Sequence, residues 1–210
     1  MYVYKLLIII LVLFITRRFY RLIIPCNLIK VEFEKIKFKT GDLLLFSNSK
    51  MMRFITSEMW THVAVVVRVN NEYYAFEISP KYHFPALIKI EKKILKNQGL
   101  VAYRKINRDV DNKLTRNFIQ RMRLERYSHM TYIEYTLRSF ISQLPYLFLP
   151  LDTDRHHYYS CCSTLASNYL INAGVISEEA YFPWDFARNL RMSNGYLYSN
   201  IVEIDRQNLN

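Results

Sequence analysis

The stretch from Thr61 to Ser79 constrains the fold more than any other part of the chain, because it reads as two β-strands joined by a tight turn. A β-branched run from Val63 to Val69 precedes Asn70-Asn71, and an aromatic-rich run from Tyr73 to Ile78 follows. Such residues favour strands, and asparagine tolerates the positive φ angles of a two-residue hairpin loop. The sequence therefore predicts an antiparallel hairpin with a defined register.

The register of this hairpin places a histidine beside a glutamate. With the two asparagines in the loop, Ala64 lies opposite Glu77, and His62 is the diagonal neighbour of that glutamate. A carboxylate within reach of an imidazole can hold its tautomer and orientation, and Ala64 and Ala75 beside the pair leave room for another element to dock. Because side chains alternate along a strand, the other face carries the bulky residues Val63, Val65, Val67, Tyr74, Phe76 and Ile78.

Length and composition indicate one domain with an N-terminal anchor. A chain of 210 residues with 51% hydrophobic content is long enough for one sizeable core. We predict a membrane anchor with a basic flank over residues 1–24, a linker or edge strand over 25–39, and a folded domain over 40–210. The 3 cysteines are an odd number, and Cys161 and Cys162 are adjacent, which argues against a disulfide scaffold and for a reducing compartment.

The predicted anchor begins with an almost wholly apolar run, Met1 to Ile15, which Lys5 interrupts and Arg17, Arg18 and Arg21 follow. The run is shorter than the roughly 20 residues of a spanning helix, and no small-residue cleavage site follows, so an uncleaved single-pass anchor is favoured over a signal peptide. Basic residues after the run place the domain on the cytosolic side, where they would bind an anionic lipid surface. The alternative is a buried N-terminal helix of a soluble protein.

The net charge of +11 raises nucleic acid as a partner, but no zinc-finger spacing, helix-turn-helix signal or aromatic RNA-binding motif accompanies it. We therefore expect no nucleic-acid partner. One combination to weigh as zinc ligands is His156, His157, Cys161 and Cys162. Adjacent pairs lack the spacing of a zinc site, so no metal and no organic cofactor is expected. The oligomeric state stays open.

The rest of the chain predicts strands and helices around the hairpin, in a sheet of about five strands or more. Further strands are predicted over Leu43–Phe46, Ala86–Ile90, Leu100–Ile106 and Tyr196–Ile204. Helices are predicted within Asn48–Met59, Asp109–Arg126 and Thr131–Gln143, with a short one opened by Pro183–Phe186. Two connections stand out: a lysine-rich turn, Lys92–Gly99, and an apolar loop, Leu144–Leu151, for which covering the core, touching a bilayer or binding an acyl chain are the alternatives.

The stretch from Tyr159 to Gly174 predicts a helix with a thiol in its first turn. Ser160 is a suitable N-cap, and Gly174 suits the position after the C-cap. A thiol there lies at the positive end of the helix dipole, which lowers its pKa, while the neighbouring Cys161 points roughly 100° away. One apolar stripe of the helix comprises Cys162, Leu165, Ala166, Tyr169, Leu170 and Ala173.

Packing this stripe on the alanine face of the hairpin would bring Cys162 to His62, with Glu77 behind His62, in a thiol–imidazole–carboxylate arrangement. Backbone N–H groups at the helix start, including that of Cys162, would then face a tetrahedral oxyanion. The alternative for Cys162 is a small core residue. The doubled cysteine also leaves Cys161 as an alternative nucleophile.

Four short motifs follow one another along the chain: Thr40-Gly41-Asp42-Leu43, Thr61-His62-Val63-Ala64, Phe76-Glu77 and Cys162-Ser163-Thr164-Leu165. In this order they resemble the circularly permuted branch of the NlpC-type papain-like thiol hydrolases, which includes bacterial YiiX-like proteins and poxviral relatives. Pro183–Phe186 is similar to a Pro-x-Asp-apolar segment of that family. The anchor and the insert between Ile106 and Ser160 are not part of the shared pattern.

The resemblance implies an α+β fold, namely a circularly permuted papain-like (NlpC-type) domain whose antiparallel sheet packs on the nucleophile helix. It implies Cys162 as nucleophile, His62 as base and Glu77 as the orienting residue of a hydrolase or acyltransferase acting on amide or ester bonds. The substrate would be a peptide or a lipid acyl compound. The alternatives are a catalytically inactive membrane-bound interaction module on the same fold and a lipid-binding protein that uses Leu144–Leu151.

Overall fold

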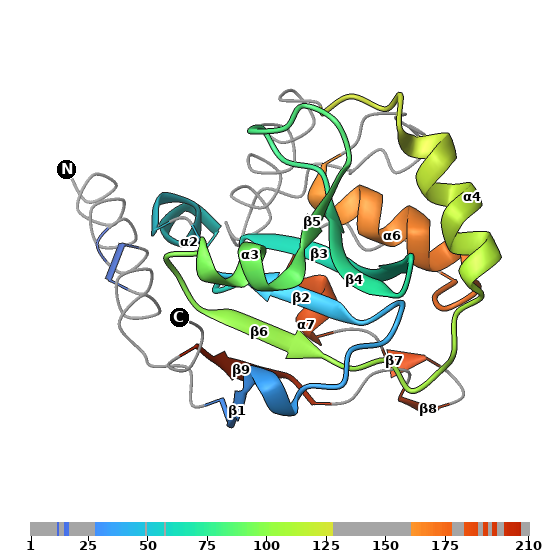
Figure 1. The fold of residues 1–210 in the computed structure, drawn as a ribbon. Coiled ribbons are helices and arrows are strands. Elements are labelled where there is room, and N and C mark those ends of the chain that lie inside the picture. Colours follow the sequence, from blue (N-terminus) through green and yellow to red (C-terminus); the bar gives the residue numbers. More distant parts are fainter. Residues whose placement is uncertain are drawn as a thin grey trace.

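The protein has a mixed α+β fold built around one seven-stranded sheet with the strand order β1-β9-β6-β2-β3-β4-β5 (Figure 1). The structure is a computed structural model that describes residues 12, 15–16, 28–48, 50–56, 58–127, 161–177, 183–188, 191–192, 195–196 and 200–206. The strands of the sheet are β1 (Lys30–Glu32), β2 (Leu43–Phe46), β3 (His62–Val69), β4 (Glu72–Glu77), β5 (Ala86–Lys89), β6 (Val101–Arg104) and β9 (Val202–Asp205). Neighbouring strands are antiparallel except β1 and β9, which are parallel.

Helices cover both faces of this sheet. They are α2 (Lys50–Thr56), α3 (Ile90–Leu95), α4 (Asn112–Met122), α6 (Cys162–Asn172) and α7 (Asp185–Arg188), with a 3-10 turn η1 (Phe33–Lys35) and a small ribbon of β7 (Arg191–Met192) and β8 (Gly195–Tyr196). In Figure 1, α4 and α6 lie together on one side of the sheet and α3 lies on the other. The predicted helices near Asn48–Met59 and Asp109–Arg126 are confirmed as α2 and α4.

The central hairpin forms as the sequence predicts. Asn70 and Asn71 have φ angles of 49° and 65°, the left-handed values that a two-residue loop requires. The register pairs Val69 with Glu72 and continues to Val65 with Phe76. The hairpin and its register are therefore confirmed.

The two faces of the hairpin pack against different helices. The prediction that the Cys162 helix packs on the alanine face was wrong. The bulky face, with Val63, Val65 and Val67, packs on α4 and on the apolar stripe of α6, in one core cluster. The alanine face, with Ala64 and Ala75, is instead covered by α3. Because burial of apolar area drives packing, the long stripe of α6 gains more against valines than it would against alanines. Helix α6 therefore lies on the opposite face from the one predicted.

Helix α3 replaces most of the predicted lysine-rich turn at Lys92–Gly99. Ile90 and Ile94 are buried against the alanine face, 3% and 0% exposed, and their spacing of four residues puts them on one side of the helix. Only Lys96–Gly99, after the end of the helix, remain a connection to β6. The turn prediction is thus wrong over Lys92–Leu95, which belong to a short helix with Lys92 exposed and Lys93 half-buried.

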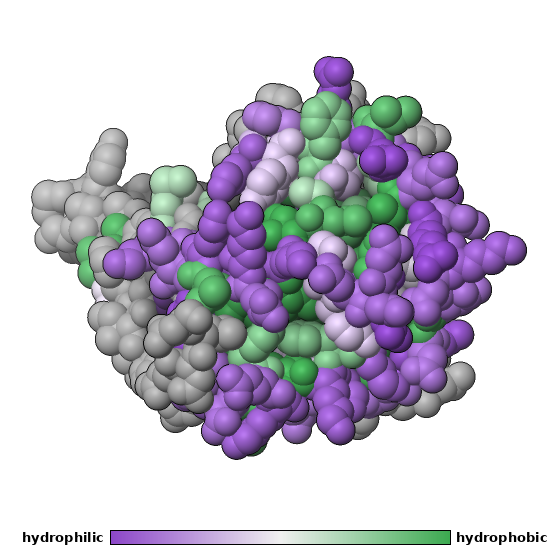
Figure 2. Space-filling view, in the orientation of Figure 1, coloured by the Kyte–Doolittle hydropathy of each residue, from purple (hydrophilic) through white to green (hydrophobic). Residues whose placement is uncertain are grey.

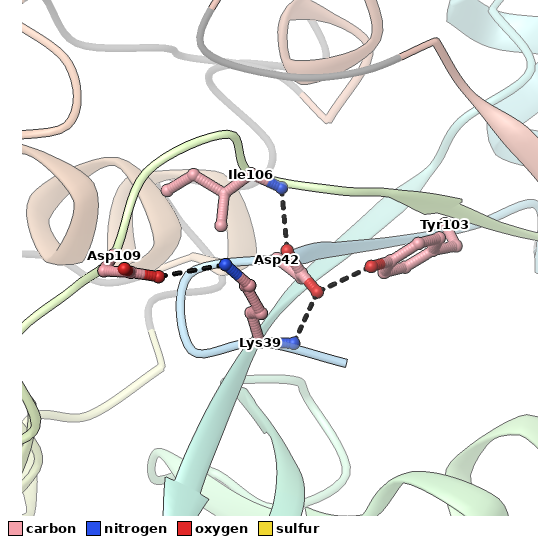
Figure 3. A network of polar contacts seen from close by, with 5 residues as sticks. All are labelled: Lys39, Asp42, Tyr103, Ile106 and Asp109. Carbon is pink, nitrogen blue, oxygen red and sulfur yellow. Dashed lines mark hydrogen bonds and ion pairs between the residues drawn. The ribbon is translucent and has the colours of Figure 1, made fainter. Parts of the chain in front are cut away.

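The Gly41-Asp42 turn before β2 is held by a buried carboxylate (Figure 3). Gly41 has a φ angle of 97°, which favours glycine, and Asp42 is 0% exposed. The carboxylate of Asp42 accepts hydrogen bonds from the Lys39 and Ile106 backbone N–H groups, at 2.6 and 2.7 Å, and from the Tyr103 hydroxyl at 2.7 Å. These bonds join the turn to β6 and fix the start of β2, which pairs with β3.

The N-terminal anchor predicted over residues 1–24 lies outside the described residues, apart from residues 12, 15 and 16. In the described part of the chain, no helix has the length and apolar character needed to cross a membrane. Within the predicted linker, β1 is an edge strand of the sheet. The helix predicted at Thr131–Gln143 and the apolar loop Leu144–Leu151 also lie outside the described residues.

Candidate active site

Cys162 is the first residue of α6 and is 8% exposed. The N-cap is Cys161 rather than Ser160, which lies outside the described residues. The backbone N–H of Cys161 donates to Thr164 Oγ1 at 2.8 Å, which closes the first turn. Because the N–H groups of a first turn have no partner within the helix, the thiol of Cys162 lies at the positive end of the helix dipole.

His62 and Glu77 form a buried pair at the start of β3 and the end of β4. His62 Nε2 lies 2.7 Å from Glu77 Oε2, and the two side chains are 12% and 0% exposed. The Phe46 ring packs beside the imidazole with 5.7 Å between ring centroids. The diagonal pairing predicted from the hairpin register thus brings these two side chains into direct contact.

Cys162 completes a cluster of three, although its helix lies on the other face of the sheet. The Cys162 thiol and the His62 ring are hydrogen-bonded, and the backbone N–H of Val63 donates to the sulfur. Since Glu77 holds Nε2, Nδ1 is the nitrogen left to face the thiol. His62 is the first residue of β3, so its ring lies at the end of the sheet, where an element on either face can reach it.

The electrostatics of the cluster favour a charged thiolate–imidazolium pair. Burial lowers the pKa of His62, but Glu77 and Cys162 raise it more, to about 9. Burial raises the pKa of Glu77, but His62 and Lys93 lower it more, to about 2. Burial likewise raises the pKa of Cys162, and the neighbouring His62 and Val63 N–H bring it below its usual value.

Cys161 is a contrasting thiol one residue away. It is 3% exposed, and burial raises its pKa above the usual value for cysteine. Its sulfur lies 3.2 Å from Ser163 Oγ, and after burial the largest effect on its pKa comes from the charge of Cys162, which raises it. The pKa values of the two thiols are therefore shifted in opposite directions. The surroundings of Cys162 stabilise its thiolate, and those of Cys161 destabilise it.

Lys93 belongs to the same cluster, although it is not among the site residues predicted from the sequence. Its Nζ lies 2.5 Å from Glu77 Oε1, its side chain is 16% exposed, and it lies 4.9 Å from the centroid of the Phe46 ring. Glu77 therefore has a cation on each carboxylate oxygen. The available signal was the four-residue spacing of Ile90 and Ile94, which predicts a short helix with Lys93 beside its buried side.

Replacing Lys93 with methionine is expected to lower the free energy of unfolding by about 2–4 kcal/mol, because it leaves one oxygen of a buried carboxylate without its partner. Chemical denaturation at pH 7 measures this. Lys89→Met is the matched control, since it breaks an ion pair with Glu72 whose side chains are 59% and 53% exposed. Exposed pairs contribute little, so equal losses in the two variants would contradict a buried structural role for Lys93.

A pocket of about 390 Å³ opens beside the cluster. This volume lies within the range of small-molecule sites, roughly 300–1,000 Å³. Both Cys162 and His62 line it, so the thiol faces a space that a substrate can enter. The other lining residues are Asn48, Met52, Thr61, Ile78, Ser79, Pro80, Lys81, Tyr82, Ile88, Lys92, Lys93, Lys96, Asn97 and Tyr127.

Among the described residues, no group of three or more His, Cys, Asp or Glu side chains is arranged to hold a metal ion. His156 and His157, weighed above as zinc ligands with the two cysteines, lie outside those residues.

No known family profile and no curated protein matches the sequence. The structure is similar to a crystal structure described as the metalloprotein YiiX from Escherichia coli O157:H7. The two share 14% sequence identity over 80% of this chain and 89% of that one, with a TM-score of 0.45.

Proposed function

We propose that this protein is a cysteine-dependent hydrolase or acyltransferase that acts on amide or ester bonds, with Cys162 as the nucleophile. One observation supports this most strongly. The Cys162 thiol, at the start of a helix and at the wall of a pocket, is hydrogen-bonded to an imidazole whose other nitrogen lies 2.7 Å from a buried carboxylate. This is the arrangement that activates a thiol for attack on a carbonyl carbon.

Each residue of the cluster has a distinct role in the proposed reaction. The Cys162 thiolate attacks the carbonyl carbon, a C–S bond forms, and the carbonyl electron pair moves to oxygen. When that oxyanion collapses, the C–N or C–O bond breaks and the leaving group takes a proton from His62. Water, or an acceptor alcohol or amine, then gives a proton to His62 and attacks the thioester. The C–S bond breaks, which releases the acyl product and restores the Cys162 thiolate beside protonated His62. Glu77 keeps the ring oriented and favours its protonated form.

The first turn of α6 supplies donors for the oxyanion. The backbone N–H of Cys162 is one of the N–H groups that lack a partner within the helix. In the proposed reaction it donates to the developing negative charge on the carbonyl oxygen. The same turn therefore serves twice, first by stabilising the thiolate and then by stabilising the tetrahedral intermediate.

The pH dependence of ester hydrolysis tests the proposal. The reaction needs Cys162 deprotonated and His62 protonated. As the pH increases, the rate should rise at a pH below the ordinary thiol pKa of about 8.5, because the pKa of Cys162 is lowered. It should fall again near pH 9, because the pKa of His62 is raised to about 9. We expect a bell-shaped profile for a neutral activated ester, p-nitrophenyl butyrate, measured between about pH 5 and pH 9.5 after subtraction of the Cys162→Ser rate.

A rate that rises once, near the pKa of an unperturbed thiol, with no alkaline fall, would contradict the proposed ion pair. The pH dependence of unfolding, followed by circular dichroism over the same range, is the control. It separates loss of a catalytic proton from loss of the fold.

The proposal also includes the fold family and the cellular location that the sequence leads us to expect. We assign the domain to the circularly permuted papain-like fold, on the order of its motifs, and residues 1–24 to a membrane anchor with the domain on the cytosolic side. Fractionation of cells that express the chain with and without residues 1–24 tests the anchor. Membrane recovery of both forms would contradict it.

A further inference from the structure

The pocket beside Cys162 is lined by four lysines and, among the described residues, by no aspartate or glutamate. Lys81 comes from the loop after β4, while Lys92 and Lys93 come from α3 and Lys96 from the C-cap of α3. The spacing of four between Lys92 and Lys96 puts them on one side of this helix. Side chains from two separate elements therefore bring positive charge to one cavity.

Three of these lysines have no charge partner in the described part of the chain. Lys93 is neutralised by Glu77 at 2.5 Å. Other lysines of the molecule sit beside carboxylates, such as Lys39 with Asp109 at 3.0 Å and Lys89 with Glu72 at 3.0 Å. No such pair is recorded for Lys81, Lys92 or Lys96 within the described residues.

The pocket also has an apolar part. Met52 and Ile78 are 7% and 0% exposed, and Ile88 is half-buried; all three line the same cavity as the lysines and Cys162. On the face of the molecule that carries α3, Figure 2 shows an area of hydrophobic residues bordered by hydrophilic ones. Such a site suits a ligand with one apolar portion and one anionic portion.

We propose that the pocket selects acyl substrates that carry a phosphate group, with the acyl portion against Met52, Ile78 and Ile88 and the phosphate facing Lys81, Lys92 and Lys96. This rests on the proposed function for its reacting atom, Cys162. Lysine ammonium groups bind phosphate as point charges, and no arginine lines the described part of the pocket to pair a carboxylate in bidentate fashion. A phospholipid headgroup and a soluble phosphorylated acyl compound offer the same chemistry.

Charge-matched thiol reagents test the anion preference on the full chain. Alkylation of Cys162 by anionic iodoacetate and by neutral iodoacetamide is followed by peptide mass spectrometry, and the ratio of the rates is normalised to that of glutathione. We expect a normalised ratio of roughly three to ten, from the summed potential of nearby charges at physiological salt. It should fall at least about threefold in Lys81→Gln/Lys92→Gln/Lys96→Gln.

The matched control is Lys30→Gln/Lys37→Gln/Lys113→Gln, which removes the same charge from exposed lysines outside the pocket. Its ratio should stay near the starting value. Equal falls in both variants would show a general effect of net charge and overturn the proposal. The absolute rate with iodoacetamide reports separately on Cys162, so a thiol that reacts no faster than glutathione but keeps the anion preference would count against the proposed function alone.

A protection experiment identifies the source of the phosphate. Phenyl phosphate, vesicles of phosphatidylcholine, and vesicles of phosphatidylcholine with phosphatidic acid are each tested for slowing iodoacetamide alkylation of Cys162. Protection by phenyl phosphate alone indicates a soluble substrate, and protection only by phosphatidic acid vesicles indicates a lipid. In both cases protection must be lost in the Lys81, Lys92 and Lys96 variant. Protection by none of the three overturns the phosphate proposal.

Discussion

Replacing Cys162 with serine is expected to lower the hydrolysis of p-nitrophenyl butyrate by at least about 10³-fold. A serine hydroxyl cannot ionise near neutral pH, so the charged pair with His62 is lost although the shape of the side chain is kept. The hydrolysis rate at pH 7 measures the effect, and thermal unfolding of the variant checks that it folds.

Cys161→Ser is the matched control for this experiment. Cys161 is the N-cap of α6, a position that serine fills well, and burial raises the pKa of its thiol. Activity should remain within about twofold of the unmodified protein. The assignment of the nucleophile is wrong if Cys161→Ser removes activity and Cys162→Ser keeps it.

Replacing His62 with asparagine is expected to lower the same rate by about 10²–10⁴-fold, the range of a general acid–base residue. The loss has two causes that act together. The water that attacks the thioester loses its proton acceptor, and Cys162 loses the neighbour that lowers its pKa, so less thiolate forms at pH 7. The pH profile should therefore shift toward alkaline values as well as fall in height.

His83→Asn is the control for this second substitution. His83 is exposed in the loop between β4 and β5, and its φ angle of 57° is one that asparagine adopts readily. Its hydrolysis rate should stay near that of the unmodified protein. A His62→Asn variant that folds and retains its rate within about twofold would remove His62 from the mechanism.

The hairpin shows why part of this fold could be predicted from local chemistry. Asn70 and Asn71 set the turn, and a two-residue turn sets the register along the whole of both strands. Because side-chain direction alternates strictly in a strand, the contact of His62 with Glu77 follows from that register. No long-range information is needed for this half of the site.

The choice of face for α6 shows what local patterns leave out. The sequence shows which residues of the helix are apolar, but both faces of the hairpin accept apolar partners. The face on which α6 packs depends on which helix buries more apolar area on each face. The structure puts Leu165 and Tyr169 against Val65 and Val67 in one cluster. The Cys162–His62 contact arises all the same, because His62 lies at the very end of β3.

The position of Lys93 beside Glu77 depends on the short helix α3, which the sequence indicates only weakly. Helix α3 has 6 residues, begins at Ile90, and has Lys89 as an N-cap that makes no side-chain cap hydrogen bond. Propensity has little weight over so few residues, since helix formation is cooperative and short helices depend on tertiary packing. The lysines between Ile90 and Ile94 suggested a solvated turn, whereas burial of those two isoleucines decides the structure.

The pairing of β1 with β9 depends on contacts between distant parts of the chain. Lys30–Glu32 and Val202–Asp205 are paired in parallel at the edge of the sheet. The charged and partly alternating sequence near Val31 is compatible with a linker as well as an edge strand. Pairing with β9, from the other end of the chain, decides between a linker and an edge strand. No local pattern in the sequence predicts such pairing.

The central claim is that Cys162 is a thiolate stabilised by His62, and the pH dependence of iodoacetamide alkylation tests it most directly. Peptide mass spectrometry follows Cys161 and Cys162 separately at each pH. We expect the alkylation rate of Cys162 to reach half its maximum well below the ordinary thiol pKa of about 8.5, while Cys161 stays unmodified. Half-maximal alkylation of Cys162 at or above that value, or faster alkylation of Cys161, would contradict it.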